Sequence, residues 1–243
     1  MQRFHYDTIG STNSQARGLA AEHPGDVLLV TAGEQTAGRG RRGRTWHSPR
    51  GGAWMSFVWP MTRPASAYAA TSLVAGVALR RAIRQVAGDG ADLHIKWPND
   101  LLAGGRKLAG ILCEQRPGAG GATGTLVIGI GVNIDFDDEL FPPELRPSAT
   151  TLRAAVGRAP TVEEVIAATA REVAVAMQAL EREGLSEAML TELRGALAYV
   201  GEVQVWDSPR GVVTGRVLGL DGVGRLLLET ADGTIACESG EFA

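Results

Sequence analysis

A run of glycine and arginine residues gives this chain its densest local positive charge. Residues 35–50 read QTAGRGRRGRTWHSPR, with no apolar period, so the sequence predicts a loop. Guanidinium groups and the backbone amides that glycine leaves accessible both bind anions, so this loop suits a phosphate or a carboxylate. Trp46 adds an aromatic plane that could stack on a purine. A loop whose arginines only face solvent is the alternative.

A second block, KWPNDLLAGGRKLAGILCEQ, begins at Lys96 and contains both lysines of the chain, against 22 arginines. With histidine counted as neutral, every other basic residue of the chain is arginine. Lysine at 96 and 107 therefore suggests positions where a compact ammonium group serves and a planar guanidinium would not. Asn99 and Asp100 follow Pro98 near the end of a short predicted strand, where binding groups often lie. An Asx turn and a solvent-exposed hairpin lysine are the structural alternatives.

A third block, TLVIGIGVNID, predicts a buried strand interrupted by Gly129 and Gly131 and followed by Asn133. Glycine inside a strand indicates a bulge or the close approach of a ligand or another backbone. The glycines do not form the dinucleotide-binding pattern, and the chain contains no GxxxxGK[ST] phosphate loop. The polar residues Ser11 to Asn13 are predicted to cap a first helix.

Alternating strands and helices are predicted to position these blocks, in an α+β arrangement. Strands are expected over residues 4–6, 27–31, 53–59, 93–96 and 125–134, with a hairpin at residues 104–105. The strand at 53–59 alternates as a half-buried strand would. Helices are expected over residues 11–22, 65–87, 161–183 and 185–199, with Thr161 as a cap.

From about residue 200 the chain changes to short, glycine-punctuated strands, which predict a small antiparallel barrel. The expected domains are residues 1–199 and 200–243, with no flexible spacer between them. Cys113 and Cys237 lack metal-ligand spacing and are expected to be reduced thiols, so no metal site is predicted from the protein's own side chains.

Composition narrows the class of protein. Lys and Arg number 24 and Asp and Glu 27, so the net charge is −3, although residues 35–88 hold nine arginines and no acidic residue. The overall balance disfavours a general nucleic-acid-coating protein. No apolar run is long enough for a membrane span, and no secretory signal is visible, so we expect a cytoplasmic protein with no membrane partner.

Together, STN at 11, EQTAGRGRRGRTWHSPRGG at 34, KWPNDLLAGGRKLAGIL at 96 and GIGVNID at 129 closely resemble the biotin protein ligase family. The order and spacing of the blocks agree, and the similarity extends to Gly240 and Glu241. The resemblance implies a mixed-sheet, class II synthetase-like catalytic domain with flanking helices. A small Src-homology-3-like β-barrel would follow it.

The resemblance also implies an activity. Such an enzyme joins biotin to ATP, giving biotinyl-5′-AMP and pyrophosphate, with Mg²⁺ as activator. It then transfers biotin to one lysine of a biotin carboxyl carrier protein, such as that of acetyl-CoA carboxylase. The chemistry fits the residue types, because joining a carboxylate to a phosphate requires neutralising charge.

Roles for individual residues follow from the resemblance alone. Lys107, Arg41 and Asp100 are expected to be catalytic, Asp100 as a metal or lysine-orienting group. The residues expected to bind biotin are Ser11, Thr12, Asn13, Gln35, Gly38, Arg39, Arg41, Lys107 and Gly110. Those expected to bind ATP or the adenylate are Arg41, Arg42, Arg44, Trp46, Asn99, Lys107 and Asn133.

Two further expectations concern partners. Some family members carry a helix-turn-helix domain before the STN block, but here the block begins at residue 11, so we expect a ligase without that domain and without DNA binding. Members of the family often pair through their sheets, so a homodimer is one expectation. A lipoate protein ligase, an RNA-binding module and a biotin sensor without turnover are the rival interpretations.

The loop is also predicted to change order on binding. Fixing a flexible Gly-Arg segment costs conformational entropy, so residues 36–50 are expected to be mobile alone and ordered over biotin or the adenylate. Cleavage at the loop arginines by trypsin should therefore slow when biotin and ATP are added. Cleavage at an unchanged rate would contradict this prediction.

Overall fold

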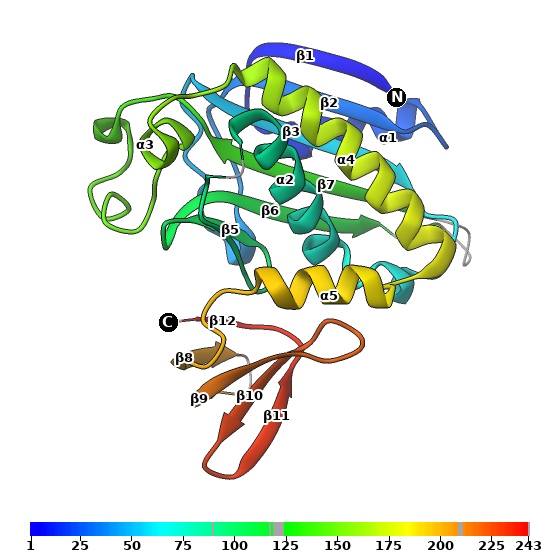
Figure 1. The fold of residues 1–243 in the computed structure, drawn as a ribbon. Helices are drawn as coiled ribbons and strands as arrows, with labels where there is room; N and C mark the ends of the chain where they lie inside the picture. The colour runs from blue at the N-terminus through cyan, green and yellow to red at the C-terminus, as the bar shows by residue number, and fades with distance from the viewer. Residues whose placement is uncertain (89, 117, 119–123, 209–210, 243) are drawn as a thin grey trace.

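A seven-stranded mixed sheet forms the larger part of the protein (Figure 1). The computed structural model describes residues 1–88, 90–116, 118, 124–208 and 211–242. Only the β1 and β2 strands pair in parallel, and all other neighbours are antiparallel. In sheet order the strands are β1 (Gln2–Ile9), β2 (Leu28–Gln35), β3 (Gly52–Pro60), β7 (Thr125–Asn133), β6 (Arg106–Arg116), β5 (Asp100–Ala103) and β4 (Leu93–Lys96). The predicted α+β class with a mixed sheet is confirmed.

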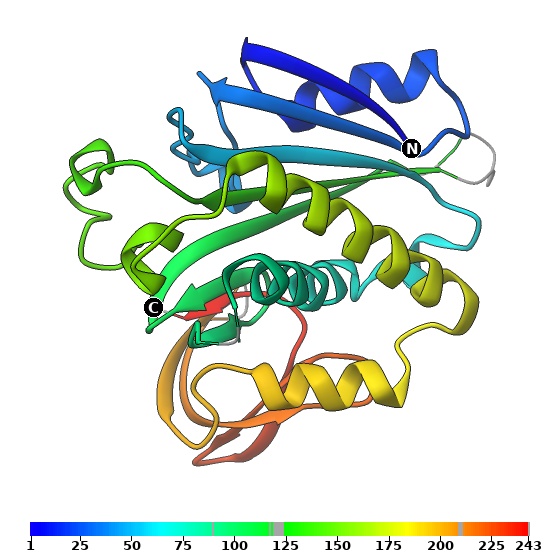
Figure 2. The same ribbon diagram turned by 45° about the horizontal axis from the view of Figure 1, so that its top comes forward.

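Helices cover both faces of this sheet. Helix α1 (Thr12–Glu22) packs on one face, whereas α2 (Thr71–Ala87) and α4 (Val162–Glu183) pack together on the other (Figures 1 and 2). Two shorter helices are α3 (Leu152–Val156) and α5 (Glu187–Ala196). Single 3₁₀ turns are η1 (Arg41–Gly43), η2 (Ala65–Tyr68) and η4 (Asp138–Leu140). None of the helices in the described residues is long and apolar enough to cross a membrane.

The β3 strand corrects one prediction. The sequence predicts a half-buried strand, yet every residue from Gly52 to Trp59 is buried. The alternation itself is right, because Met55 and Phe57 pack in the core under α2 and α4 while Val58 packs toward α1. Because helices cover both faces of the sheet, the side chains on both faces of β3 are buried. Neither face needs polar residues.

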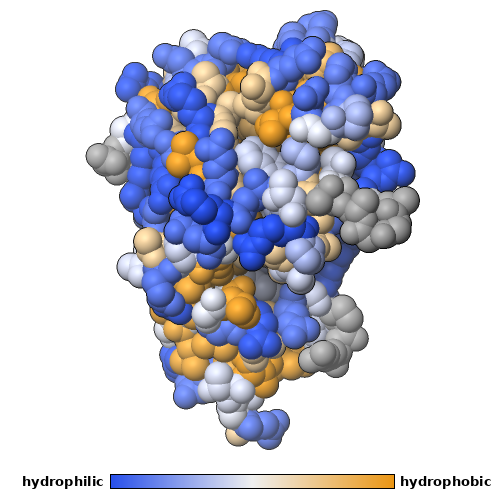
Figure 3. Space-filling view, turned by 90° about the vertical axis from the view of Figure 1, so that its right-hand side faces the viewer, coloured by the Kyte–Doolittle hydropathy of each residue, from blue (hydrophilic) through white to orange (hydrophobic). Residues whose placement is uncertain are grey.

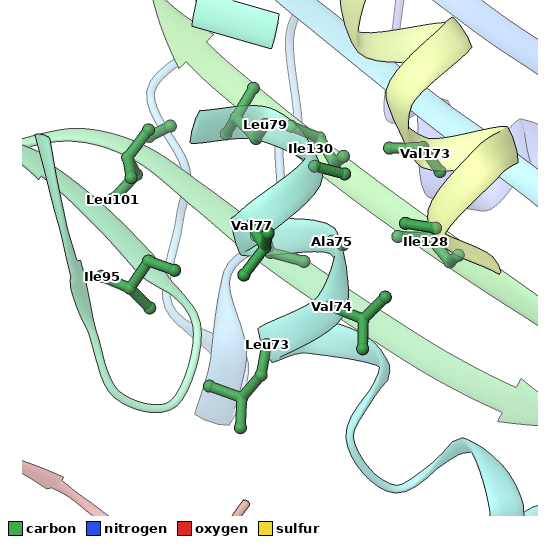
Figure 4. Packing of buried hydrophobic residues seen from close by; sticks show 14 of the residues in the cluster. Leu73, Val74, Ala75, Val77, Leu79, Ile95, Leu101, Ile128, Ile130 and Val173 are labelled. Carbon is green, nitrogen blue, oxygen red and sulfur yellow. The ribbon is translucent and has the colours of Figure 1, made fainter. Parts of the chain in front are cut away.

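Helix α2 supplies much of the main core. Figure 4 shows Val74, Val77 and Leu79 of this helix lying among side chains of the strands and of α4. The strand partners include Ile95 and Ile130, both 2% exposed or less. Burying branched aliphatic side chains from four elements stabilises the face of the sheet opposite α1.

Two helix boundaries differ from prediction. The helix predicted over 65–87 is split, because the hydroxyl of Tyr68 accepts from the Thr62 amide (2.9 Å) and donates to Glu181 (2.7 Å), which anchors η2 away from α2. The last helix ends at Ala196 rather than residue 199. There the chain turns, and Tyr199 adopts a positive φ of 65°.

Five antiparallel strands form a second sheet below α5 in Figure 1. In sheet order they are β11 (Gly233–Cys237), β10 (Leu226–Thr230), β9 (Gly211–Leu220), β8 (Val203–Ser208) and β12 (Glu241–Phe242). The antiparallel strands confirm that part of the prediction. The strand pairings of the described residues leave β11 and β12 as edges, so closure into a barrel stays a prediction.

Aromatic contacts join the second sheet to the first. The indole N–H of Trp97 donates to the Gly224 carbonyl at 2.9 Å, and the Trp97 and Trp206 ring centroids lie 5.1 Å apart. The outer part of the second sheet is less covered. Hydrophobic residues gather there in Figure 3, and Val203 and Val212 are more than half exposed.

Both cysteines are free, as the sequence predicts. Burial raises the pKa of Cys113 to about 12 and raises the pKa of Cys237 as well. Both thiols therefore stay protonated near neutral pH. Because the thiolate is the nucleophilic form, neither cysteine is expected to react readily.

The cap of α4 gives a stability test. The Thr161 hydroxyl accepts from the Glu164 amide (3.2 Å), and the Glu164 carboxylate accepts from the Thr161 amide (2.8 Å), which confirms the predicted cap. Replacing Thr161 by Ala should lower the free energy of unfolding in urea by about 1 kcal/mol. Thr161→Ser, which keeps the hydroxyl, should lose much less, and equal losses would contradict this role of the cap.

Candidate active site

A pocket lies where the Gly-Arg loop, the start of α1 and the middle of β6 and β7 meet. Its cavity volume is about 170 Å³. Twelve of the residues predicted to bind or react line it: Ser11, Thr12, Asn13, Gln35, Arg39, Arg41, Arg44, Trp46, Asn99, Lys107, Gly110 and Asn133. Gly38, Arg42 and Asp100 do not line it. Residues from four separate sequence blocks thus share one cavity.

One side of the pocket is a compact, mostly neutral polar cluster. The side-chain oxygen of Gln35 accepts from the backbone amide of Thr12 at 2.8 Å and lies 3.0 Å from the Thr12 hydroxyl. Ser56, which is fully buried on β3, lies 2.8 Å from the Thr12 hydroxyl and 2.6 Å from Asn13 Oδ1. The cluster holds the first turn of α1 against the sheet.

This cluster has more oxygen contacts than hydroxyl hydrogens. Thr12 and Ser56 contribute one hydroxyl hydrogen each, while three oxygen-to-oxygen contacts join Gln35, Thr12, Ser56 and Asn13. One of these contacts therefore has no hydrogen of its own. A patch with surplus acceptors favours a ligand that brings N–H donors.

Glycines form the floor of the pocket. A Cβ added to Gly129 would lie 2.1 Å from Asn13 Oδ1, and one added to Gly131 would lie 2.4 Å from Nε1 of Trp46. Gly110 on β6 is similarly close to the Trp46 ring, at 2.9 Å. The strand glycines predict a bulge or the close approach of a ligand or another backbone. The structure instead places the side chains of Asn13 and Trp46 against them.

The other side of the pocket is cationic. Lys107 Nζ lies 5.2 Å from the centre of the Trp46 ring and 2.7 Å from Asp100 Oδ2. Lys107 is therefore not the free, exposed hairpin lysine considered from the sequence, because a carboxylate and an aromatic ring hold its ammonium group. Asp100 Oδ1 is buried and has no hydrogen-bond partner among the described residues.

The loop arginines face different partners. Arg41 donates to Asn99 Oδ1 at 3.0 Å, and its burial, with Arg42 nearby, lowers its pKa, although a guanidinium remains charged at neutral pH. Arg42 and Arg44 both pair with Glu241 on β12, 3.1 Å away in the case of Arg42. Arg42 is thus directed to the second sheet and away from the pocket lining.

Gly38 acts through the path of the loop. A Cβ at Gly38 would lie 2.3 Å from the Trp46 carbonyl and 2.6 Å from Ser48 Oγ. The Trp46 amide also donates to the Gly38 carbonyl at 2.9 Å. The loop segment at Gly38 therefore lies directly against the segment at residues 46–48, and no side chain larger than glycine fits between them.

Asn133 and Lys96 complete the polar residues singled out from the sequence. Asn133 is 3% exposed and donates to the Thr150 carbonyl at 3.2 Å. Lys96 lies 5.9 Å from the Tyr199 ring and 5.8 Å from the Phe242 ring, outside the pocket lining. Burial lowers the pKa of Lys96, opposed by the nearby Asp100 carboxylate.

Sequence reasoning missed three polar residues of the pocket lining, Thr45, His47 and Ser148, and two behind it, Ser56 and Glu114. Ser56 is the one hydroxyl in the apolar run AWMSFVW, a signal that could have been noticed. Glu114 accepts from Asn13 Nδ2 at 2.9 Å and pairs with Arg39, but nothing in its local sequence marks it. Apolar walls from Phe141, Leu145 and Ala149 were also unforeseen, since they come from a distant segment.

Comparison with known proteins identifies the family. The model of the biotin/lipoate A/B protein ligase family matches residues 8–133, over half of the chain. The chain belongs to this family. The model of the biotin protein ligase C-terminal domain matches residues 202–243, which include the second sheet.

Individual members of the biotin/lipoate ligase family are similar along nearly the whole chain. The bifunctional ligase/repressor BirA of Bacillus subtilis is 35% identical over 95% of this chain and 70% of its own length. The biotin–[acetyl-CoA-carboxylase] ligase of Mycobacterium tuberculosis is 31% identical over 96% and 85%. The Aquifex aeolicus biotin protein ligase, solved with biotin and ATP, matches with a TM-score of 0.83 and 25% identity over 100% of this chain and 97% of that one.

The glycine floor gives a test of this ligase site. Gly131→Ala places a methyl group in contact with the Trp46 indole, so Trp46 must leave its position, and biotin affinity should fall at least about tenfold by calorimetry. Gly195→Ala on α5 is the matched control, because no atom lies within 4 Å of its added Cβ. Unchanged affinity in Gly131→Ala would show that Trp46 does not shape the binding site.

Proposed function

We propose that this protein is a biotin protein ligase. It activates biotin with ATP to biotinyl-5′-AMP and transfers the biotinyl group to a lysine of a carrier protein. The observation that carries the proposal is the division of one pocket into an acceptor-rich neutral patch and a cationic patch, joined across Trp46. Biotin has matching ends, a ureido ring with N–H donors and a carboxylate.

The neutral patch orients the ring of biotin. The pocket-lining oxygens of Ser11 and Thr12 accept from the ureido N–H groups, and Asn13 and Gln35 are held by their own bonds so that they need not reorganise. The thioether ring and the aliphatic chain pack beside the Trp46 ring, which itself covers the backbone of Gly110 and Gly131. These contacts leave the carboxylate directed to Lys107.

Adenylation takes place at the cationic end. A carboxylate oxygen of biotin attacks the α-phosphorus of ATP, a P–O bond forms, and the bond to the β-phosphate oxygen breaks to release pyrophosphate. Lys107, Arg41 and Arg44 neutralise charge that builds up on the phosphoryl oxygens. Asn99 and Asn133 supply amide groups to the nucleotide, and the Trp46 face stacks on adenine.

Transfer follows at the carbonyl of the mixed anhydride. The carrier lysine's neutral amine attacks, the C–N bond forms, and AMP leaves with the former carboxylate oxygen. The amine loses its proton to solvent as AMP leaves, and Asp100 orients Lys107 beside the phosphate through their 2.7 Å ion pair.

Mg²⁺ fits the site as a partner of ATP. No group of three or more His, Cys, Asp or Glu side chains that could hold a metal occurs among the described residues. The unpartnered Asp100 oxygen is a hard ligand of the type Mg²⁺ prefers, and phosphates and water would supply the remaining ligands. When bound, the ion supplies positive charge to the triphosphate.

The proposal also includes four features that the sequence predicts beyond the pocket. These are a division at residues 1–199 and 200–243, a cytoplasmic location, an acetyl-CoA carboxylase carrier as partner and a homodimer. DNA binding is not part of the proposed function, although some relatives are named ligase/repressors. A gel-shift assay with biotin operators tests that point.

The first experiment is biotin-dependent exchange of labelled pyrophosphate into ATP, with Mg²⁺ and without a carrier protein. Exchange with biotin and not with lipoate is expected. Exchange with lipoate alone would assign the chain to the other branch named in its family. Exchange with neither would favour a binding protein without turnover.

Lys107 tests the assignment of the catalytic centre. Lys107→Ala should reduce exchange by about 10³-fold, because charge on the phosphoryl group loses its nearest ammonium. Arg106→Ala is the control, since Arg106 is the neighbouring residue on β6 and does not line the pocket. Full activity in Lys107→Ala, with a normal melting curve, would overturn the assignment.

A further inference from the structure

Glu114 on β6 joins three parts of the molecule behind the pocket. Its Oε2 accepts from Asn13 Nδ2 at 2.9 Å, and its Oε1 pairs with Arg39 of the Gly-Arg loop. Arg17 of α1 lies 3.5 Å from the same Oε1. The Glu114 side chain is only 22% exposed and does not line the pocket, so its carboxylate faces these partners rather than a ligand.

From Glu114 a series of polar contacts returns to the other end of the same loop. Asn13, which Glu114 holds, contacts Ser56, and Ser56 contacts Thr12. The series then runs from Thr12 to Gln35 at 2.8 Å, from Gln35 Nε2 to Ser48 Oγ at 2.8 Å, and from Ser48 to the Trp46 carbonyl at 3.1 Å.

The result is a closed circuit around the neutral end of the pocket. It starts on the loop at Arg39 and ends on the loop at Trp46, and between them it passes through β6, α1, β3 and β2 before it returns to the loop at Ser48. Glu114 is the single charged residue between the two loop ends. Ser56 and Thr12 are buried, so their positions are set by packing, whereas the Arg39 contact is held by charge.

We propose that Glu114 is a positioning residue for the biotin site: its carboxylate holds the Arg39 end of the loop closed and fixes the carboxamide of Asn13. The inference rests on the proposed function and adds a residue to it. Glu114 acts through Arg39 and Asn13 and does not contact substrate. Arg17 remains beside Glu114 when Arg39 leaves, so the carboxylate keeps a cation and the loop can open to admit biotin.

The kinetic consequence is specific. Losing the Glu114 charge frees Arg39 and leaves the loop to be ordered by the ligand, which weakens biotin binding. It does not alter the groups around the α-phosphate, because Lys107 and Arg41 have other partners. The biotin KM should therefore rise while kcat stays nearly constant.

Glu114→Gln is the test variant, because glutamine keeps the size and an acceptor for Asn13 but removes the charge. In pyrophosphate exchange we expect the biotin KM to rise about tenfold, as for the loss of a charge-assisted hydrogen bond, with kcat within about twofold of wild type. Glu163→Gln is the matched control, since that carboxylate pairs with Arg3 away from the pocket.

A double-mutant cycle separates positioning from general destabilisation. In an Arg39→Ala background, Glu114→Gln should no longer change the biotin KM, because the interaction is already absent. An equal effect in both backgrounds, or no effect in the wild-type background, would overturn the inference. A fall in kcat at constant KM would do so as well.

Failure of the proposed function can be recognised separately. If the wild-type protein shows no biotin-dependent exchange, that function is wrong whatever the variants do. Trypsin cleavage at the loop arginines needs no substrate, and it should be faster in Glu114→Gln than in wild type or Glu163→Gln. Equal cleavage rates would contradict the holding role of Glu114.

Discussion

The site depends on side chains that are absent from two adjacent strands. Gly110, Gly129 and Gly131 expose the backbone of β6 and β7, and Trp46 and Asn13 rest directly on that backbone. Any larger residue would require the indole or the carboxamide to move by more than their packing allows. The neutral and cationic ends of the pocket keep their spacing because both are built on this floor.

Acidic residues from distant segments distribute the positive charge of the loop. Glu114 forms an ion pair with Arg39, and Glu241 pairs with Arg42 and Arg44. Outside the loop, Asp100 pairs with Lys107 of β6. A dense run of arginines would otherwise repel itself in a closed conformation. Arg39 is therefore held by β6, Arg42 and Arg44 by β12, and Lys107 by β5, so similar side chains are fixed in different places.

Local sequence patterns predict the fold class and most elements, and the resemblance of four sequence blocks to the family predicts most of the polar residues that line the pocket. It does not predict Glu114, whose role depends on pairing across 75 positions with Arg39. The burial of β3 on both faces was likewise missed, since it depends on where α1, α2 and α4 pack. The sequence places Lys107 in the site, but it does not predict the contacts of Lys107 with Asp100 and Trp46, because these depend on the fold.

Trp46 also differs from the other four tryptophans in its surroundings. Trp54, Trp59, Trp97 and Trp206 are at most 5% exposed and belong to packed cores, so their environment is fixed in the folded protein. Trp46, in contrast, is partly exposed and lines the pocket. The chain thus carries an intrinsic optical reporter: changes in ultraviolet emission upon ligand addition to the folded protein originate mainly from one indole.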